Sequence, residues 1–264
     1  MQERHTDRKQ YFEEQGVVTQ KYVIPFIEEI IPITSDLVIA EIGCGEAGNV
    51  QPFVEMGCKV YGIDIAENKI ANGKLFYQNQ PNRDNLKLIA SDIYKLDTSE
   101  VEKFDLVYMR DTIEHIPNQE LFFAHIKQYL KPGSKLFFGF PSWRMPFGGH
   151  QQICRSKFLS FLPYFHLLPY PLYRGILKLF GESKETIICL EEIRDTKISI
   201  RRFKNIVAAN GFEIRKETLY LINPNYEIKF KLKLRKLPVF LNIPFIKDFF
   251  TTTCYYVLEN KTSL

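Results

Sequence analysis

The chain has 264 residues, 45% of them hydrophobic, which is enough to bury a full core as one large domain or as a domain with an appendage. Its formal net charge of +4 is small and no nucleic-acid recognition motif accompanies it, so we expect no nucleic-acid partner. Five scattered cysteines without CxxC spacing argue against a disulfide framework and against a zinc site, and we predict no metal.

The N-terminus is polar, and the chain has no run of about 18 apolar residues. These two features predict a cytoplasmic chain with neither a signal peptide nor a membrane span. The first element expected is an N-terminal helical segment over residues 1–35, in which Phe26, Ile27, Ile30 and Ile31 form an apolar stripe at helical spacing. Pro25 has to start or kink a helix there.

Residues 38–42 are an apolar run that ends in Gly43 and Gly45, which predicts a strand turning sharply into a helix. A second apolar run places Asp64 at the end of the neighbouring strand, where a carboxylate can accept hydrogen bonds from ribose hydroxyls. The glycine spacing also satisfies the dinucleotide-binding pattern, which is weak by itself. Glu41 points elsewhere, because a carboxylate two residues before the first glycine suits a ligand with cationic groups rather than a pyrophosphate.

The alternation of strands and helices continues along the chain. We expect helices over 49–56, 66–80 and 118–130, with Gly73 interrupting the second of them and Pro81 ending it. A strand is expected over 59–64, and residues 86–93 and 104–111 are candidates for the next two; residues 130–138 combine a Pro-Gly helix stop with a fifth strand.

Residues 142–190 break this alternation, because their aromatic side chains fall among prolines. We expect short helices joined by proline turns, forming a cap inserted after the fifth strand. A capped helix over 199–210 and strands over 212–222 and 251–259 then complete the sheet.

Residues 223–250 form a basic and aromatic insertion. Within 229–236, basic and apolar residues alternate as in a strand, yet Asn223-Pro224 is a good helix start and Pro238 a good stop. Both structures fit, and we favour the helix. Residues 151–264 carry 19 Lys and Arg against 10 Asp and Glu (net +9), so the 229–236 run can meet an anionic membrane surface or head group. A solvated basic face explains the same charges equally well.

The segment Glu41-Ile42-Gly43-Cys44-Gly45-Glu46-Ala47 resembles the first motif of the class I S-adenosylmethionine-dependent methyltransferases of the small-molecule type, although Ala47 stands at the usual third glycine. The resemblance extends over about residues 36–141. It implies one methyltransferase domain over 1–264 with a Rossmann-like α/β fold. This fold is a doubly wound, mostly parallel sheet with an antiparallel C-terminal strand and a helical cap insertion.

The resemblance implies S-adenosylmethionine as cofactor and S-adenosylhomocysteine as product. Asp64 would bind the ribose, Asp92 the adenine amino group, and Ile93 would cover the adenine ring. The N-terminal helix often closes over the cofactor in such enzymes. The cofactor-binding residues expected by this match are Glu41, Gly43, Cys44, Gly45, Asp64, Ile65, Asp92, Ile93 and Arg110.

The expected reaction moves a methyl group to an oxygen or nitrogen of a small-molecule acceptor that can be lipid- or sugar-linked. Such an acceptor can gain from a general base, and histidine is the natural candidate near neutral pH. His115 follows the fourth strand and His150 follows the fifth, so both belong to the edge where open α/β sheets bind ligands. Alternatively, His115 orients its loop and His150 caps a helix.

Two other functions remain open: a nucleotide-linked oxidoreductase, and a non-catalytic methyltransferase-like binding protein. Glu41 and Asp92 count against the first, and the intact cofactor motifs count against the second. The sequence leaves the oligomeric state undetermined.

Overall fold

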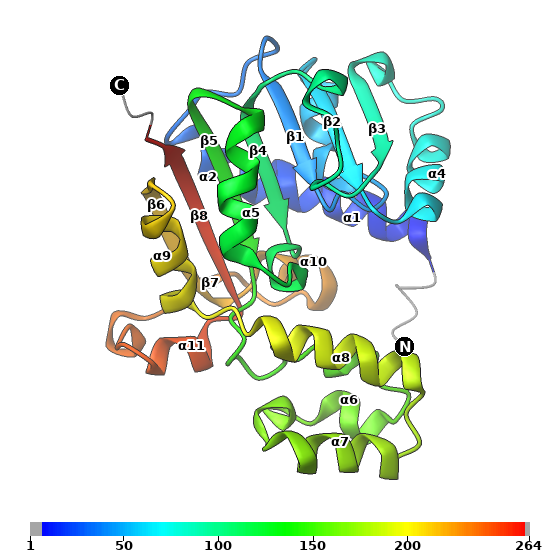
Figure 1. Cartoon of the computed structure of the whole chain (residues 1–264), viewed down its shortest axis with the longest axis vertical. Helices are drawn as coiled ribbons and strands as arrows, with labels where there is room; N and C mark the ends of the chain where they lie inside the picture. The colour runs from blue at the N-terminus through cyan, green and yellow to red at the C-terminus, as the bar shows by residue number, and fades with distance from the viewer. Residues whose placement is uncertain (1–6, 262–264) are drawn as a thin grey trace.

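The fold is built on one eight-stranded sheet with the strand order β3-β2-β1-β4-β5-β8-β6-β7. The structure, a computed structural model, describes residues 7–261, so the first six residues of the predicted 1–35 helical segment lie outside the described part. Figure 1 shows the sheet with helices on its two faces and a group of helices below it. The strands are β1 Val38–Ile42, β2 Lys59–Asp64, β3 Leu86–Ala90, β4 Phe104–Arg110, β5 Leu130–Phe140, β6 Phe212–Ile222, β7 Arg235–Lys236 and β8 Thr253–Asn260.

The first five strands are parallel, so their carboxyl ends meet at one edge of the sheet. Every residue of β1 is buried, as expected for a strand covered on both faces. The C-terminal strand β8 lies antiparallel between β5 and β6. The predicted Rossmann-like α/β class with an antiparallel C-terminal strand is therefore confirmed.

The core has one layer on each face of the sheet. In β5, Phe137 packs on one face and Phe138 on the other, as the two-residue period of a strand requires. Helices α1 to α4 cover the Phe137 face, and α5 and α9 cover the Phe138 face. These helices are α1 Arg8–Val18, α2 Ile24–Glu28, α3 Gln51–Glu55, α4 Glu67–Phe76, α5 Gln119–Ile126 and α9 Ile200–Ala209.

Most helix starts and stops follow the sequence signals, but the expected Pro-Gly helix stop is wrong, because Pro132 and Gly133 lie within β5. Pro25 is in the first turn of α2, which continues from α1 through a π-helical turn over Thr19–Val23. Helix α9 begins at its predicted cap, because the Ser199 side chain accepts the backbone N–H of Arg202. Helix α4 ends at Phe76 rather than at residue 80, and Gly73 does not interrupt it. A Cβ at Gly73 would lie 2.9 Å from the Glu46 carbonyl oxygen, so this glycine serves close packing.

The region after β5 contains the expected short helices. They are α6 Lys157–Phe161, α7 Tyr170–Leu179 and α8 Lys184–Thr196, so the helical run extends beyond the predicted boundary at residue 190. They have a small apolar core of their own, in which Leu159, Tyr173 and Leu177 are fully buried. In Figure 1 this helical cap lies below the carboxyl ends of the parallel strands.

The structure of residues 223–250 differs from the favoured single helix. Helix α10, Pro224–Phe230, begins as predicted, with the Asn223 side chain accepting the backbone N–H of Asn225 at 2.9 Å. It ends well before Pro238, because Lys231 adopts a left-handed conformation with φ of 56° and Leu232 N–H bonds back to the Tyr226 carbonyl. The basic run then continues into the short strand β7, and α11, Ile246–Phe250, follows. Within residues 7–261, no helix combines the length and apolarity that crossing a membrane needs.

Candidate active site

The turn after β1 is held in a left-handed conformation at Gly43 (φ 75°) and Gly45 (φ 56°). Gly43 N–H donates to the Ile63 carbonyl at 2.8 Å, which joins the turn to β2. Ala47, at the position of the usual third glycine, is itself left-handed with φ of 63°. Gly48 is required for another reason, because a Cβ there would lie 2.5 Å from the Phe12 carbonyl oxygen of α1.

Asp64 lies at the carboxyl end of β2 and faces this turn. Its Oδ2 accepts the backbone N–H of Gly45 at 2.8 Å, and its Oδ1 accepts that of Ala66 at 2.8 Å. An ionised carboxylate offers about four acceptor sites, so two remain for a ligand hydroxyl. Ile65, the next residue, is 75% exposed and therefore available to a ligand.

Glu41 is fully buried beneath the glycine turn. The side-chain amide of Asn49 donates to its Oε1 at 2.6 Å, while its Oε2 has no hydrogen-bond partner in the described part of the chain. Burial raises the pKa of Glu41 to about 8, against the lowering effect of Asn49. A buried carboxyl with an open oxygen is suited to compensating a bound cation.

Asp92 follows β3 and lies near Asp64, because Ser91 N–H donates to the Asp64 carbonyl at 3.0 Å. Its own Oδ1 accepts the Tyr94 N–H at 3.0 Å. The side chain of Ile93 packs into the core, so contact of Ile93 with an adenine ring stays a prediction. Cys44 is buried, and burial raises the pKa of its thiol well above the ordinary value, so it is not an activated nucleophile.

Arg110 lies at the carboxyl end of β4 and is only 6% exposed. Its Nη2 donates to the Asn225 side chain of α10 at 3.1 Å, and its Nε is 3.7 Å from Asp111 Oδ2. Among residues 7–261, Nε and Nη1 have no hydrogen-bond acceptor. Tyr11 of α1 and Lys229 of α10 line a small pocket beside the guanidinium. The site is thus open to an anionic group.

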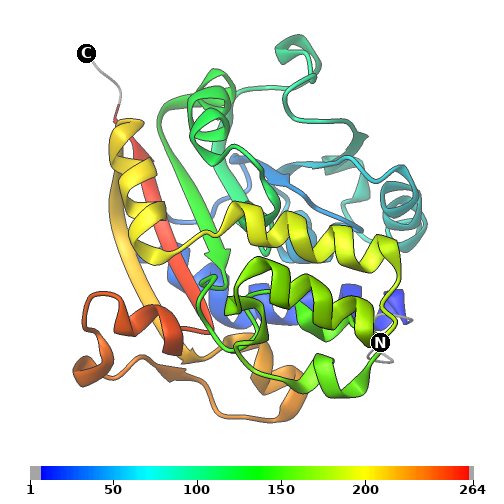
Figure 2. The ribbon, with the colours of Figure 1, turned by 60° about the horizontal axis from the view of Figure 1, so that its bottom comes forward.

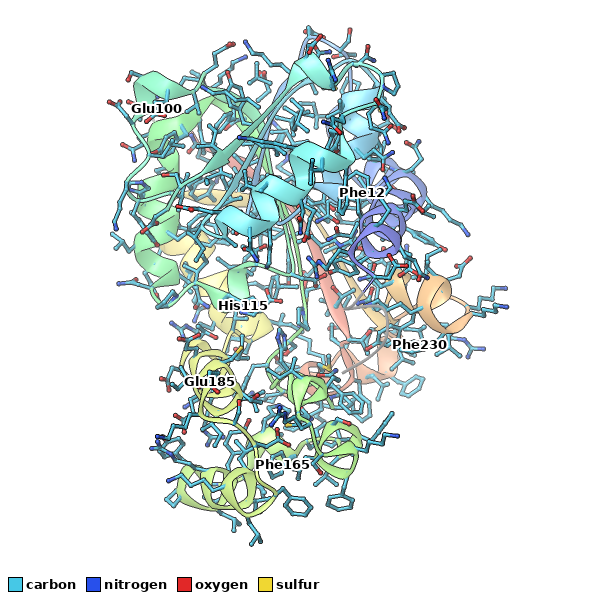
Figure 3. All side chains as sticks on the ribbon, turned by 90° about the vertical axis from the view of Figure 1, so that its right-hand side faces the viewer. Phe12, Glu100, His115, Phe165, Glu185 and Phe230 are labelled. Carbon is cyan, nitrogen blue, oxygen red and sulfur yellow. The ribbon has the colours of Figure 1, made fainter. Side chains whose placement is uncertain are left out.

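His115 and His150, distant in sequence, lie side by side, with ring centroids 5.1 Å apart. Glu114 joins them, and the ligand atoms of all three side chains lie within 4.8 Å of one another. Figure 3 shows His115 at the junction of the sheet with the cap that carries Phe165 and Glu185. Glu114 was not assigned a role from the sequence. The signal available was its place directly before a candidate histidine.

Burial governs the protonation of this cluster. Desolvation lowers the pKa of His150 to about 3 and raises that of Glu114 well above its ordinary value. Desolvation also lowers the pKa of His115, although this side chain is partly exposed to solvent. At neutral pH, His150 is therefore an uncharged imidazole and a weak base.

The backbone before His150 packs tightly on the cap. A Cβ at Gly149 would lie 2.2 Å from the His166 Cβ, and one at Gly148 would lie 2.2 Å from the Trp143 carbonyl oxygen. His166 in turn contacts the same carbonyl through Nε2 at 2.7 Å. This packing fixes the left-handed conformation of His150 (φ 56°) and directs its ring toward His115.

Residues 40–138 match the family described as "Methyltransferase domain". The matched range includes the glycine turn, Asp64, Asp92, Arg110 and His115. The resemblance predicted from the motifs is therefore confirmed over this part of the chain.

Two relatives by sequence each match part of the chain. The sterol 4-C-methyltransferase strm-1 of Caenorhabditis elegans is 30% identical over 109 residues, which are 41% of this chain and 32% of that protein. A ubiquinone biosynthesis O-methyltransferase of Coxiella burnetii (strain Dugway 5J108-111) is 28% identical over 115 residues, 44% of this chain and 47% of that one. The alignments thus span about a third to a half of these relatives.

Among solved structures, the magnesium protoporphyrin IX methyltransferase ChlM from Synechocystis PCC 6803, with bound S-adenosylhomocysteine, superposes with a TM-score of 0.54. The superposition covers 93% of this chain and 83% of ChlM, at 15% sequence identity. At this identity the likeness shows a shared fold.

Proposed function

We propose that the chain, whose residues 40–138 match the family described as "Methyltransferase domain", transfers the methyl group of S-adenosylmethionine to an oxygen or nitrogen of a small-molecule acceptor. In this proposal residues 1–264 act as one domain, with 142–190 as a cap over the acceptor. The observation that carries it is the buried Glu41, with an open carboxylate oxygen, below a glycine turn that is tied to Asp64. A sulfonium cofactor carries a positive charge, which would stabilise the ionised form of this buried carboxyl.

The cofactor lies along the carboxyl ends of β1 to β4. Asp64 accepts hydrogen bonds from the ribose hydroxyls, and Asp92 accepts a hydrogen bond from the adenine amino group. Arg110 binds the cofactor carboxylate, a role supported by its Nε and Nη1, which have no hydrogen-bond acceptor among residues 7–261. Gly43, Cys44 and Gly45 of the turn, together with Ile65 and Ile93, contact the cofactor at the same edge of the sheet.

Methyl transfer from a sulfonium is an in-line displacement, so holding the acceptor against the methyl group does most of the work, worth up to roughly 7–11 kcal/mol of barrier. His115 and His150 face the acceptor in this proposal. The low pKa of His150 favours a positioning role over strong general-base catalysis at neutral pH. Asp111, with its backbone at φ of 53°, contributes a negative charge to the same corner.

An apolar or lipid-linked acceptor fits the exposed surface best. Val239 is 90% exposed and Phe240 74%, and the cationic run 229–236 precedes them. The cap exposes Phe161 and Leu179 to a similar degree. In Figure 1 the cap forms the lower end of the molecule and the segment between α10 and α11 lies above it, beside β7; Figure 2 brings the lower end toward the viewer. Apolar side chains beside cationic ones support peripheral contact with an anionic membrane.

The direct test is incubation of the full chain with methyl-labelled S-adenosylmethionine and a whole-cell extract, followed by separation of the lipid, polar small-molecule and nucleic-acid fractions and a mass search for labelled products. We expect label in a small molecule and none in nucleic acid. The oxidoreductase alternative is not favoured. A non-catalytic role would be indicated by cofactor binding without label transfer to any fraction of the extract.

A further inference from the structure

We propose that Glu114, His115 and His150 form a binding site for one divalent transition-metal cation of the zinc type, between the sheet and the cap. The role of this ion in catalysis rests on the proposed function, whereas its binding can be tested without assuming that function. The sequence prediction of no metal was based on cysteine spacing, and this site contains no cysteine.

The donor set is the first argument. Two imidazoles and one carboxylate are a common ligand set for zinc and for ferrous iron, and three protein ligands leave a coordination position open. The ligand atoms lie within 4.8 Å of one another. Around a tetrahedral ion with bonds of about 2.0–2.1 Å they would lie roughly 3.4 Å apart, so a side-chain movement of about 1 Å closes the site.

The second argument is the unpaired carboxyl of Glu114. The residue is 3% exposed, and both carboxyl oxygens lack a hydrogen-bond partner among residues 7–261. Leaving such a buried group unsatisfied costs about 1–3 kcal/mol, and more when it is charged. Asp111 adds negative charge beside it, and Lys69 is the basic side chain that acts on His115. A divalent cation would satisfy Glu114 and offset both carboxylates.

The backbone around the three ligands is held in place by hydrogen bonds and packing. The Thr196 hydroxyl of α8 donates to the Glu114 carbonyl at 2.6 Å, and His115 N–H donates to the Thr112 carbonyl at 2.9 Å. His150 is held by its left-handed backbone and by the packing of Gly149 on His166. The ligands thus come from two segments that the cap brings together, and little ordering remains for the ion to impose.

The open position gives the ion a role in the proposed reaction. If the acceptor carries a hydroxyl, an ion held by these three residues would make that hydroxyl lose its proton to water more easily, because the cation would stabilise the oxyanion. The oxygen lone pair then forms the new C–O bond while the C–S bond breaks, and the bonding pair returns to sulfur.

The test is calorimetric titration of the chelator-treated full chain with Zn²⁺ alone, repeated in competition with a chromophoric chelator. We expect one saturable site per chain. Glu114→Gln, His115→Gln and His150→Asn should each weaken it by about tenfold or more, since even partners of ligands cost that much. Asparagine tolerates the left-handed backbone of residue 150. His125→Gln is the matched control, because this histidine contacts the Ile93 carbonyl outside the cluster.

Circular dichroism of each variant checks folding, and His115→Gln, at an exposed position, keeps the test valid if a buried variant unfolds. Absence of a saturable site, or equal affinity in all four variants, would overturn the inference. Titration of the metal-free chain with S-adenosylhomocysteine separates the two proposals. Cofactor binding without zinc binding would overturn only the proposed metal site. Zinc binding without cofactor binding would overturn only the proposed function.

Discussion

Asp64 Oδ2 accepts the backbone N–H of Gly45 at 2.8 Å, so one carboxylate joins the end of β2 to the glycine turn after β1. The second oxygen of Asp64 holds the start of α4 through Ala66 N–H. The residue that we expect to bind the ribose therefore also shapes the turn that the cofactor lies against. Three elements of the cofactor site depend on this side chain.

Asp64→Ala should weaken cofactor affinity by about 1.5–3 kcal/mol, the range for hydrogen bonds to a charged group. Asp64→Asn keeps one acceptor oxygen and should lose less. Calorimetry with S-adenosylhomocysteine measures both variants, and thermal unfolding shows whether the turn has collapsed. Wild-type affinity in a folded Asp64→Ala variant would mean that the ribose lies elsewhere.

Glu41 predicts a pH dependence of cofactor binding. Its raised pKa of about 8 means that the ligand-free carboxyl is protonated below that pH and ionised above it. The cationic cofactor favours the ionised form, so affinity should increase as pH rises toward 8, by up to about tenfold per pH unit, and then level off. Titrations with S-adenosylmethionine between about pH 6 and pH 9 measure this. Glu41→Gln should remove the slope, and a slope retained in that variant would assign the titration to another group.

Gly149→Ala should destabilise the protein by about 1–3 kcal/mol or more, because the added Cβ would lie 2.2 Å from His166. Gly175→Ala in the same cap is the matched control. No atom of residues 7–261 lies within 4 Å of a Cβ at this exposed position of α7, so alanine should stabilise the helix by about 0.5–1 kcal/mol. Denaturant unfolding compares them. Equal effects of the two substitutions would contradict the tight packing before His150.

The double variant Val239→Ser and Phe240→Ser should reduce sedimentation with vesicles that contain anionic lipid, because it removes the most exposed apolar pair beside the basic run. Leu75→Ser is the control, since Leu75 is 60% exposed on α4, away from this end of the molecule. Added salt should weaken binding of the wild type. Unchanged sedimentation of the double variant would mean that Val239 and Phe240 do not contact the membrane.

The strands and the glycine turn could be predicted because their signals are local. An apolar run, two glycines and a carboxylate at each strand end define the cofactor edge without knowledge of distant contacts. The same is true of the Ser199 and Asn223 helix caps. The reason for Gly48 was not accessible in this way, since it depends on the approach of Phe12 from α1.

The parts that could not be predicted depend on distant or competing interactions. Residues 229–236 fit a helix and a strand equally well, and the left-handed backbone of Lys231 decides the outcome. His115 and His150 were separate candidates, and only the fold of the cap brings them to 5.1 Å beside Glu114. The sequence pattern could not show that Glu114 is buried without a hydrogen-bond partner among the described residues.

The central claim is that the edge formed by Glu41, Asp64 and Asp92 binds S-adenosylmethionine. Calorimetric titration of the full chain with S-adenosylhomocysteine, and in parallel with a nicotinamide dinucleotide, tests it most directly. We expect saturable one-to-one binding of S-adenosylhomocysteine, weakened by Asp64→Ala, and no binding of the dinucleotide. Tight binding of the dinucleotide with no response to S-adenosylhomocysteine would contradict it.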